Sequence, residues 1–190
     1  MQEDGGNPQP LVYRGRAWCF GDNLSVDGDM MPFHFALSRE TRLEVLREHA
    51  MTGIDPDFPN KAQPGDIVVA GRRFAQGNPH IQGLLGLRGL GLGAVVESIP
   101  RGSLRNAVNA GLPILPLCPG VTSDTRTGDS LEIDFETGRF VNLTRGIERR
   151  YPPLPEALLA IIRGGGWESN FVRRLREATT VEAGRVERES

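Results

Sequence analysis

The residues best suited to chemistry lie in one short stretch, FAQGNPHIQ, at Phe74–Gln82. The apolar run IVVAG precedes this stretch at a short distance, and a helix-like run follows it. A glycine-containing polar turn between a buried strand and a helix is typical of a loop that holds an anion. The centre of this loop is the trio Asn78-Pro79-His80. The pattern therefore predicts a functional loop whose chemistry depends on these three residues.

Each member of the trio limits what the loop can do. The amide of Asn78 donates and accepts hydrogen bonds, but it is not a base. Pro79 has no backbone N–H, which weakens a nest of N–H groups around an anion. His80 is able to act as a general acid or base, because an imidazole titrates near neutral pH, but it lacks the fork with which arginine clamps a carboxylate.

A second histidine lies in another polar segment. His34 comes just after the acidic, turn-rich stretch GDNLSVDGDMMP at Gly21–Pro32, in which Asp27 or Asp29 is expected to orient the loop by accepting backbone N–H bonds. His49, the third and last histidine, lies in the charged segment LREHAM and is expected at the surface. An isolated loop histidine is more often a solvated side chain than a functional group, so each histidine alone is weak evidence for a site.

Composition limits the class of protein. The chain has 190 residues, with 38% hydrophobic and 24% charged residues, which fits one soluble globular domain. A net charge of −2 provides no positively charged surface that would attract nucleic acid. No apolar run is long enough to span a membrane, and the polar N-terminus does not have the pattern of a signal peptide. Two isolated cysteines, Cys19 and Cys118, favour a reducing cytoplasm and are too few to hold a cysteine-ligated iron–sulfur cluster.

The elements that must position the loops follow from periodicity and turn signals. Apolar runs predict strands at Leu11–Phe20, Ile67–Gly71, Ala94–Ser98 and Leu112–Leu117, the last at a sheet edge. Helical patterns cover Ser38–Met51 with Ser38 as its cap, Ile81–Leu90, Ser103–Gly111, Leu154–Gly166, and a short last helix on Trp167, Phe171 and Leu175. The glycines of the second helix are expected to pack closely against a neighbour: Gly83, Gly86 and Gly89.

The order of these elements predicts an α/β domain. Strand–helix–strand repeats imply parallel, right-handed units, and the alternating stretch Asp129–Leu143 with its ETG turn predicts a hairpin after them. Residues 1–10 are expected to be a disordered leader, residues 11–177 one domain, and residues 178–190 a flexible tail.

Five stretches, in the same order and spacing, resemble the small subunit of isopropylmalate dehydratase, which is the swivel domain of the aconitase superfamily. The resemblance covers roughly Arg14–Arg174, and the stretches are GRAWCFGDN, MTGIDPDFPNKAQPGDIVVAGRRF, RNAVNAGLPIL, GDSLEIDFETGRFVNLTRG and LPEALLAIIRGGG. It implies an aconitase-type swivel domain (β/β/α) with a mixed sheet, parallel strand–helix–strand units and a C-terminal hairpin.

The same resemblance implies a function. Family members remove water from a 2-hydroxy (di)carboxylic acid and add it back at the neighbouring carbon, together with a large subunit that carries a four-iron–four-sulfur cluster. This chain is then expected to hold no cofactor itself and to bind neither nucleic acid nor membrane.

The resemblance also points to the site, where this chain departs from the family loop F-G-C-G-S-S-R-E-H. Gly77 is retained, whereas the family's base serine, second serine and arginine correspond to Asn78, Pro79 and His80. In the acidic stretch at Gly21–Pro32, an aspartate of the family is retained. The family's arginine after the proline corresponds to His34. The residues expected in the site are catalytic His80 and Asn78, and substrate-binding His34, Gly77, Pro79, Arg72 and Asp27, with no metal ligands.

Three interpretations stay open from the sequence. In the first, the loop has changed its chemistry, and His80 or His34 is the acid or base for a changed substrate or reaction. In the second, the chain is a catalytically degenerate paralogue that binds or regulates a large-subunit partner. In the third, it is an ordinary hydro-lyase subunit whose base comes from elsewhere. Likewise, Arg72 either lines the site or flanks the sheet in solvent. The first interpretation is the leading prediction, because two matched positions carry histidine.

Overall fold

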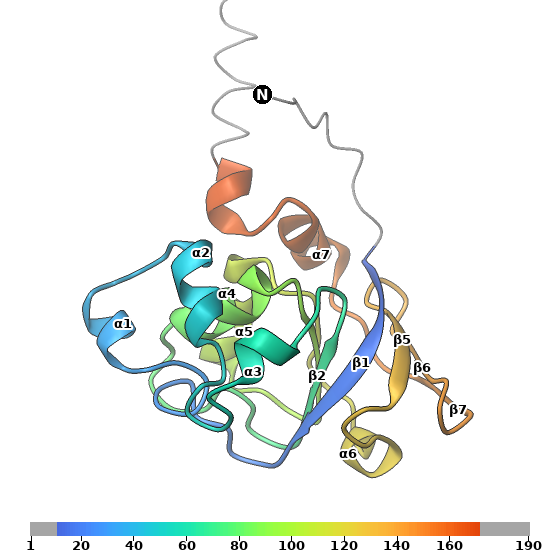
Figure 1. The fold of residues 1–190 in the computed structure, drawn as a ribbon. Coiled ribbons are helices and arrows are strands. Elements are labelled where there is room, and N and C mark those ends of the chain that lie inside the picture. The colour runs from blue at the N-terminus through green and yellow to red at the C-terminus, as the bar shows by residue number, and fades with distance from the viewer. Residues whose placement is uncertain (1–10, 172–190) are drawn as a thin grey trace, which may run out of the picture.

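The computed structural model describes residues 11–171 of the chain, and a seven-stranded mixed sheet forms its centre (Figure 1). The strand order is β4-β3-β2-β1-β5-β6-β7. β1 joins two halves: β1 to β4 are parallel, while β1, β5, β6 and β7 pair in antiparallel fashion. The strands are β1 Val12–Phe20, β2 Ile67–Ala70, β3 Gly93–Val96, β4 Ile114–Leu115, β5 Ser130–Asp134, β6 Arg139–Asn142 and β7 Ile147–Arg150.

Helices gather around the parallel half, and the antiparallel strands lie at the other end of the molecule (Figure 1). The crossovers through α4 and α5 connect β2 to β3 and β3 to β4, and a longer one through α1, α2, η1 and α3 connects β1 to β2, as parallel pairing requires. The helices are α1 His34–Leu37, α2 Leu43–Leu46, η1 Arg47–His49, α3 Phe58–Lys61, α4 Gln82–Gly89, α5 Arg101–Ala110, α6 Val121–Asp124 and α7 Glu156–Arg163.

The core lies on both faces of the parallel strands. Every residue of β2 and β3 is buried, which explains why their sequences are continuous apolar runs rather than alternating ones. By contrast, β5 alternates between buried and partly exposed residues, as expected for a sheet with one covered face. The predicted α/β fold class, the parallel units and the edge position of the last parallel strand are confirmed.

The glycine-lined face of α4 packs closely, as the sequence predicted. A Cβ added at Gly83 would lie 2.9 Å from Cβ of Met30, and one added at Gly89 would lie 2.9 Å from the carbonyl oxygen of Leu43. The missing side chains thus allow α4 to approach α2 and the segment that precedes α1.

Several predicted elements differ in the structure. The predicted helix at Ser38–Met51 is wrong in its first half: Ser38 ends α1 and its hydroxyl donates to the carbonyl of Phe35, while helix begins only at Leu43. The predicted C-terminal hairpin is confirmed as β5 and β6, but β7 extends it into a three-stranded meander; the sequence did not predict β7, because this charged and largely exposed strand shows no alternating pattern. Short helices α1 and α3 lie in segments that the sequence indicated as loops.

The predicted leader at 1–10, the predicted tail at 178–190 and the last part of the predicted final helix, at Leu175, lie outside the described residues. Residues 167–171 are helical, as predicted for the start of that helix. Among residues 11–171, no helix is long and apolar enough to cross a membrane.

Candidate functional site

The two polar loops leave the sheet side by side. β1 and β2 are parallel neighbours whose last residues, Phe20 and Ala70, are paired, so the segments after them start at the same edge. The carboxyl edge of parallel strands is where open α/β sheets usually bind ligands. We refer to residues 21–33 as the first loop and to residues 71–80 as the second loop.

Backbone hydrogen bonds fix the two loops to each other. The N–H of Asn23 donates to the carbonyl of Arg72 at 2.7 Å, the N–H of Gln76 donates to that of Leu24 at 2.9 Å, and the N–H of Val26 donates to that of Gln76 at 2.9 Å. These contacts extend the parallel pairing of β1 and β2 into the loops. Side chains at the ends of the two loops are therefore held in a fixed relation.

The second loop carries unusual backbone geometry. Arg73 and Ala75, which both have a Cβ, adopt left-handed φ values of 58° and 54°, and Gly77 has a φ of 100°. Left-handed non-glycine residues cost of order 1 kcal/mol or more each and persist where surrounding contacts enforce them. Phe74 supplies such a contact, because its side chain is fully buried and its N–H donates to the carbonyl of Ser98 at 3.0 Å.

Side chains of α5 hold the end of the second loop. The hydroxyl of Ser103, which is buried, donates to the carbonyl of Ala75 at 2.5 Å, and the amide of Asn106 donates to the carbonyl of Pro79. Pro79 forms the centre of a tight turn in which the N–H of His80 donates to the carbonyl of Asn78 at 2.7 Å. The fixed φ of proline suits such a three-residue turn.

His80 and Asp27 meet across the two loops. Nδ1 of His80 lies 2.8 Å from Oδ2 and 2.9 Å from Oδ1 of Asp27, and the two side chains keep 31% and 24% of their surface exposed. The neighbouring aspartate, Asp29, instead accepts the N–H of Ser25 at 2.8 Å. Of the two aspartates that the sequence left open, Asp29 orients the backbone and Asp27 contacts the imidazole.

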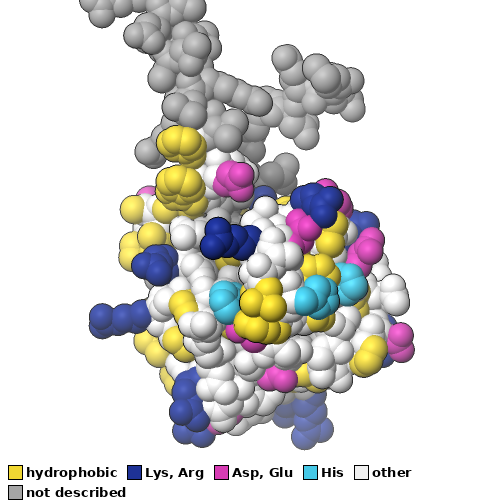
Figure 2. All heavy atoms as spheres, turned by 90° about the vertical axis from the view of Figure 1, so that its left-hand side faces the viewer, with side chains coloured by type: hydrophobic (Ala, Val, Ile, Leu, Met, Phe, Trp, Pro, Cys, Tyr) yellow, Lys and Arg dark blue, Asp and Glu magenta, His cyan; other side chains and the backbone are white. Residues whose placement is uncertain are grey.

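Aromatic rings continue the site across the surface. The rings of Phe33 and His80 are 5.8 Å apart, those of His34 and Phe35 are 4.1 Å apart, and those of Phe35 and His49 are 4.7 Å apart. Figure 2 shows histidine side chains on one face of the molecule with apolar side chains between them. His49, expected at the surface, is partly buried in this row of rings.

The other predicted site residues lie around this pair with different surroundings. Gly77, Asn78 and Pro79 are exposed in the second loop. The guanidinium of Arg72 is exposed and bonds to Asp22 at 2.7 Å, so its charge is already paired at the sheet edge. The N–H and guanidinium of Arg72, which both donate to the Asp22 carboxylate, lower the pKa of that carboxyl.

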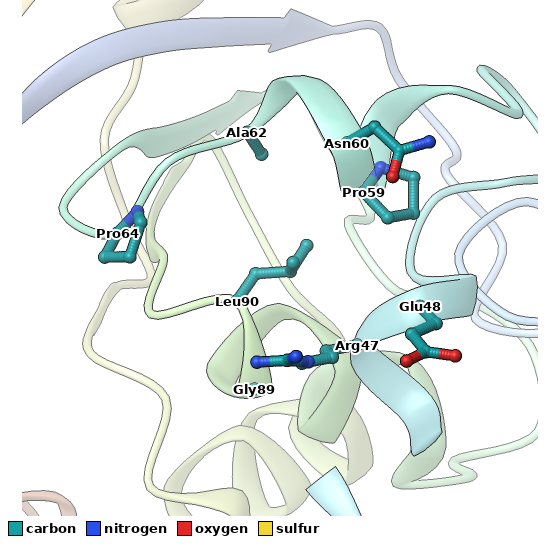
Figure 3. Close-up of a pocket in the computed structure, with 8 residues that line it drawn as sticks. All are labelled: Arg47, Glu48, Pro59, Asn60, Ala62, Pro64, Gly89 and Leu90. Carbon is teal, nitrogen blue, oxygen red and sulfur yellow. The ribbon is translucent and has the colours of Figure 1, made fainter. Parts of the chain in front are cut away.

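One hollow in the molecule lies away from both loops. A hollow of about 510 Å³ between α3, η1 and the end of α4 contains none of the predicted site residues (Figure 3). Its lining residues are Arg47, Glu48, Pro59, Asn60, Ala62, Pro64, Gly89 and Leu90. In the second loop, Gly77, Asn78 and Pro79 are exposed, so this part of the predicted site lies at the surface of the chain.

The thiols are poor ligands and poor nucleophiles. Burial raises the pKa of Cys19 to about 11 and that of Cys118 to about 12. Among residues 11–171, no group of three or more histidine, cysteine, aspartate or glutamate side chains is placed to hold a metal ion.

Sequence reasoning missed the residues that position the loops. Ser103 and Asn106 lie in α5, more than 20 positions from their partners, and their types are ordinary for a helix. The sequence predicted a helix at Ser103–Gly111 and a family-like stretch RNAVNAG, but neither pattern indicates that Asn106 contacts Pro79. Close contact with Pro79 is visible only when the helix is placed against the second loop.

Known proteins resemble this chain in sequence over most of its length. No family model matches the chain. It is 38% identical to the isopropylmalate/citramalate isomerase small subunit of Methanocaldococcus jannaschii over 88% of this chain and 98% of that protein. It is 37% identical to the methanogen homoaconitase small subunit of Methanothermobacter thermautotrophicus, over 86% of this chain and 93% of that protein.

A solved structure extends the likeness to three dimensions. The 3-isopropylmalate dehydratase structure from Methanocaldococcus jannaschii matches with a TM-score of 0.78 and 27% identity, over 90% of this chain and 99% of that one. The sheet, its crossovers and the site loops therefore belong to a known swivel-domain architecture. The chain belongs to the family of isopropylmalate dehydratase-type small subunits.

Proposed function

We propose that this chain is the small subunit of a hydro-lyase that acts on a 2-hydroxy (di)carboxylic acid together with a separate large subunit in the cytoplasm. The observation that carries the proposal is the near full-length relationship to proteins named as small subunits of such enzymes. The carboxyl-edge position of the two loops supports it, since Gly77, Asn78 and Pro79 are exposed there, where a second subunit could contact them.

The iron–sulfur cluster belongs, in this proposal, to the large subunit. Cys19 and Cys118 do not fit a cysteine-ligated cluster, because such a cluster needs more thiolates and burial keeps both thiols protonated at neutral pH. The contribution of this chain is therefore binding and proton transfer by its own side chains. His80, Asn78 and His34 are the leading candidates, with Gly77, Pro79, Arg72 and Asp27 around them.

The substrate, we further propose, carries fewer or smaller anionic groups than a typical family substrate. Pro79 removes an N–H donor from the second loop, and an imidazole at His80 offers no bidentate fork for a carboxylate. The fork of Arg72 is already engaged by Asp22. These features support a weaker hold on a second carboxylate.

The test is co-expression of the full chain with the large subunit encoded by the same genome, under anaerobic conditions, followed by a panel of 2-hydroxy mono- and dicarboxylic acids. Formation of the unsaturated acid should require both subunits, and monocarboxylic or small dicarboxylic acids should be turned over best. A stable complex that dehydrates none of the acids would overturn the enzymatic proposal.

The second candidate is a degenerate paralogue that binds or regulates a large subunit. Asn78 favours it, since an amide cannot replace a basic group. In that case the complex would form, but its activity would not respond to substitutions in the second loop. Asn78→Ser and His80→Ala in the co-purified complex separate the two candidates, because the hydro-lyase proposal expects at least one to change kcat.

A further inference from the structure

Asp27 and His80 come from loops 53 positions apart in the chain, yet they form one of the closest side-chain contacts in the site. Nδ1 of His80 faces both carboxylate oxygens of Asp27, at 2.9 Å and 2.8 Å. Such a shared contact fixes the plane of the imidazole ring as well as its position. The sequence predicted both residues in one site but gave no sign that their side chains touch.

We propose that Asp27 and His80 act as a carboxylate–imidazole pair, in which Asp27 positions His80 so that its Nε2 transfers the proton during the dehydration. This inference rests on the proposed function. It makes His80 the proton-transfer group of the second loop, where the amide of Asn78 cannot act as a base.

The hydrogen-bonding chemistry of the pair sets the tautomer. A carboxylate only accepts hydrogen bonds, so Nδ1 of His80 must be the donor. When the ring is neutral, its proton is therefore on Nδ1, and Nε2 carries the free lone pair. The hydrogen bond from Nδ1 to Asp27 determines this tautomer.

Neighbouring residues hold both partners of the pair in place, and the described part of the chain shows Nε2 of His80 bonded to no other group. The hydroxyl of Ser25 donates to the carbonyl of Asp27 at 2.8 Å, and the turn at Pro79, tied to Asn106, fixes the backbone of His80. Phe33 lies against one side of the ring. Within residues 11–171, Nε2 has no hydrogen-bond partner, and 31% of the His80 side chain is exposed.

The proton balance of the step is simple. Nε2 accepts the proton from the carbon next to the carbinol carbon, the C–H electron pair becomes the C=C bond, and the C–O bond breaks with loss of hydroxide. Transfer of the proton from the imidazolium to that hydroxide completes one water. In the hydration direction, the imidazolium returns the proton to carbon.

The first experiment measures the tautomer of His80 in the full chain by NMR after ¹⁵N labelling of histidine, with His80→Gln used to assign the signal. Wild-type His80 should show the Nδ1–H tautomer when its ring is neutral, and Asp27→Asn should produce a mixture of tautomers. Asp57→Asn, which removes an exposed carboxylate before α3, should leave the signal unchanged. An Nε2–H tautomer in the wild-type chain, or no change in Asp27→Asn, would overturn the pair.

The second experiment measures kinetics in the complex with the large subunit. Asp27→Asn should lower kcat about 10²-fold and His80→Gln by 10²-fold or more, roughly the contribution of a general acid–base, with little change in KM. Asp27→Glu, which keeps a carboxylate, should recover part of kcat. If Asp27→Asn and wild type had equal kcat, the pair would have no part in the reaction, and the proposed function would still stand. If the complex were inactive on every acid, the proposed function would be wrong, and the NMR experiment would still show whether Asp27 and His80 are paired.

Discussion

Asp66 shows how much a single side chain contributes at the base of the site. Its carboxylate is nearly fully buried and accepts the N–H of Arg16 at 2.8 Å, the indole N–H of Trp18 at 2.9 Å and the N–H of Gln63 at 3.0 Å. It thereby joins the middle of β1 to the turn before β2, and these two strands carry the site loops. Asp27 and Asp29 lie two positions apart in the first loop, but they have different partners. Asp29 accepts a backbone N–H, whereas Asp27 contacts the imidazole of His80.

Asp66→Ala should destabilise the fold strongly. The change leaves three buried or partly buried donors without their acceptor, and each costs about 1–3 kcal/mol, so we expect a loss of about 3–5 kcal/mol in the free energy of unfolding. Urea denaturation followed by tryptophan fluorescence measures it. Asp57→Ala, at an exposed carboxylate, should change the free energy by less than about 0.5 kcal/mol; equal losses in the two variants would contradict the role of Asp66.

The helix α4 illustrates packing between whole elements. Its glycines allow α4 to pack against α2 and against the end of the first loop. Because the second loop leads into α4, the same helix supports both loops. Close approach of backbones requires residues without a Cβ, although each glycine costs about 1 kcal/mol of helix stability relative to alanine. The sequence spacing of three predicted this face correctly, because the helical period alone determines which residues share a side.

Gly89→Ala tests that packing. The new Cβ would lie 2.9 Å from the carbonyl oxygen of Leu43 and 3.0 Å from Cβ of Arg47, neither of which is the end of a flexible side chain. Overpacking of about 1–3 kcal/mol should outweigh the gain of about 1 kcal/mol in helix propensity and lower the melting temperature. Gly21→Ala, where no atom lies within 4 Å of the added Cβ, serves as the control in the same thermal scan. A Gly89→Ala variant more stable than wild type would show that α2 and α4 move apart freely.

The molecule as a whole has two unlike ends. One end carries α1, α2 and the site loops, and the other carries the antiparallel strands β5, β6 and β7 (Figure 1). At the first end, Phe33 and Leu37 keep 49% and 70% of their surface exposed, and the ring of Phe33 lies 5.8 Å from that of His80. Large exposed apolar side chains beside a site are typical of a surface that another protein covers. The proposed large subunit is expected to bind at this end.

Leu37→Glu should therefore weaken the complex with the large subunit about tenfold or more, as the loss of a central apolar contact does in protein interfaces. Leu143→Glu is the matched control, since Leu143 is 56% exposed but follows β6 at the opposite end. Calorimetric titration of each variant with the large subunit measures the change in Kd. If Leu143→Glu were the more damaging of the two, the proposed orientation of the subunits would be wrong.

Local pattern was enough to predict the fold class, the buried strands β2 and β3, the helices α4, α5 and α7, and the two polar loops that carry the candidate site. These features depend on period, turn residues and apolar runs, which are written in neighbouring positions. Sequence could not predict that α2 is short, that β7 extends the hairpin, or that Ser38 ends a helix instead of beginning one. In those segments local preference is weak, and contacts with distant parts of the chain decide the conformation.

Tertiary structure alone decided how the site residues are paired. His80 could have met Asp27, Asp29 or solvent, and Arg72 could have faced the site or Asp22. The choice depends on the register of β1 against β2 and on the positions of Ser103 and Asn106, all of which involve residues more than 20 positions apart. A hydrogen bond is sensitive to tenths of an ångström, whereas sequence patterns specify only which face or loop a residue occupies.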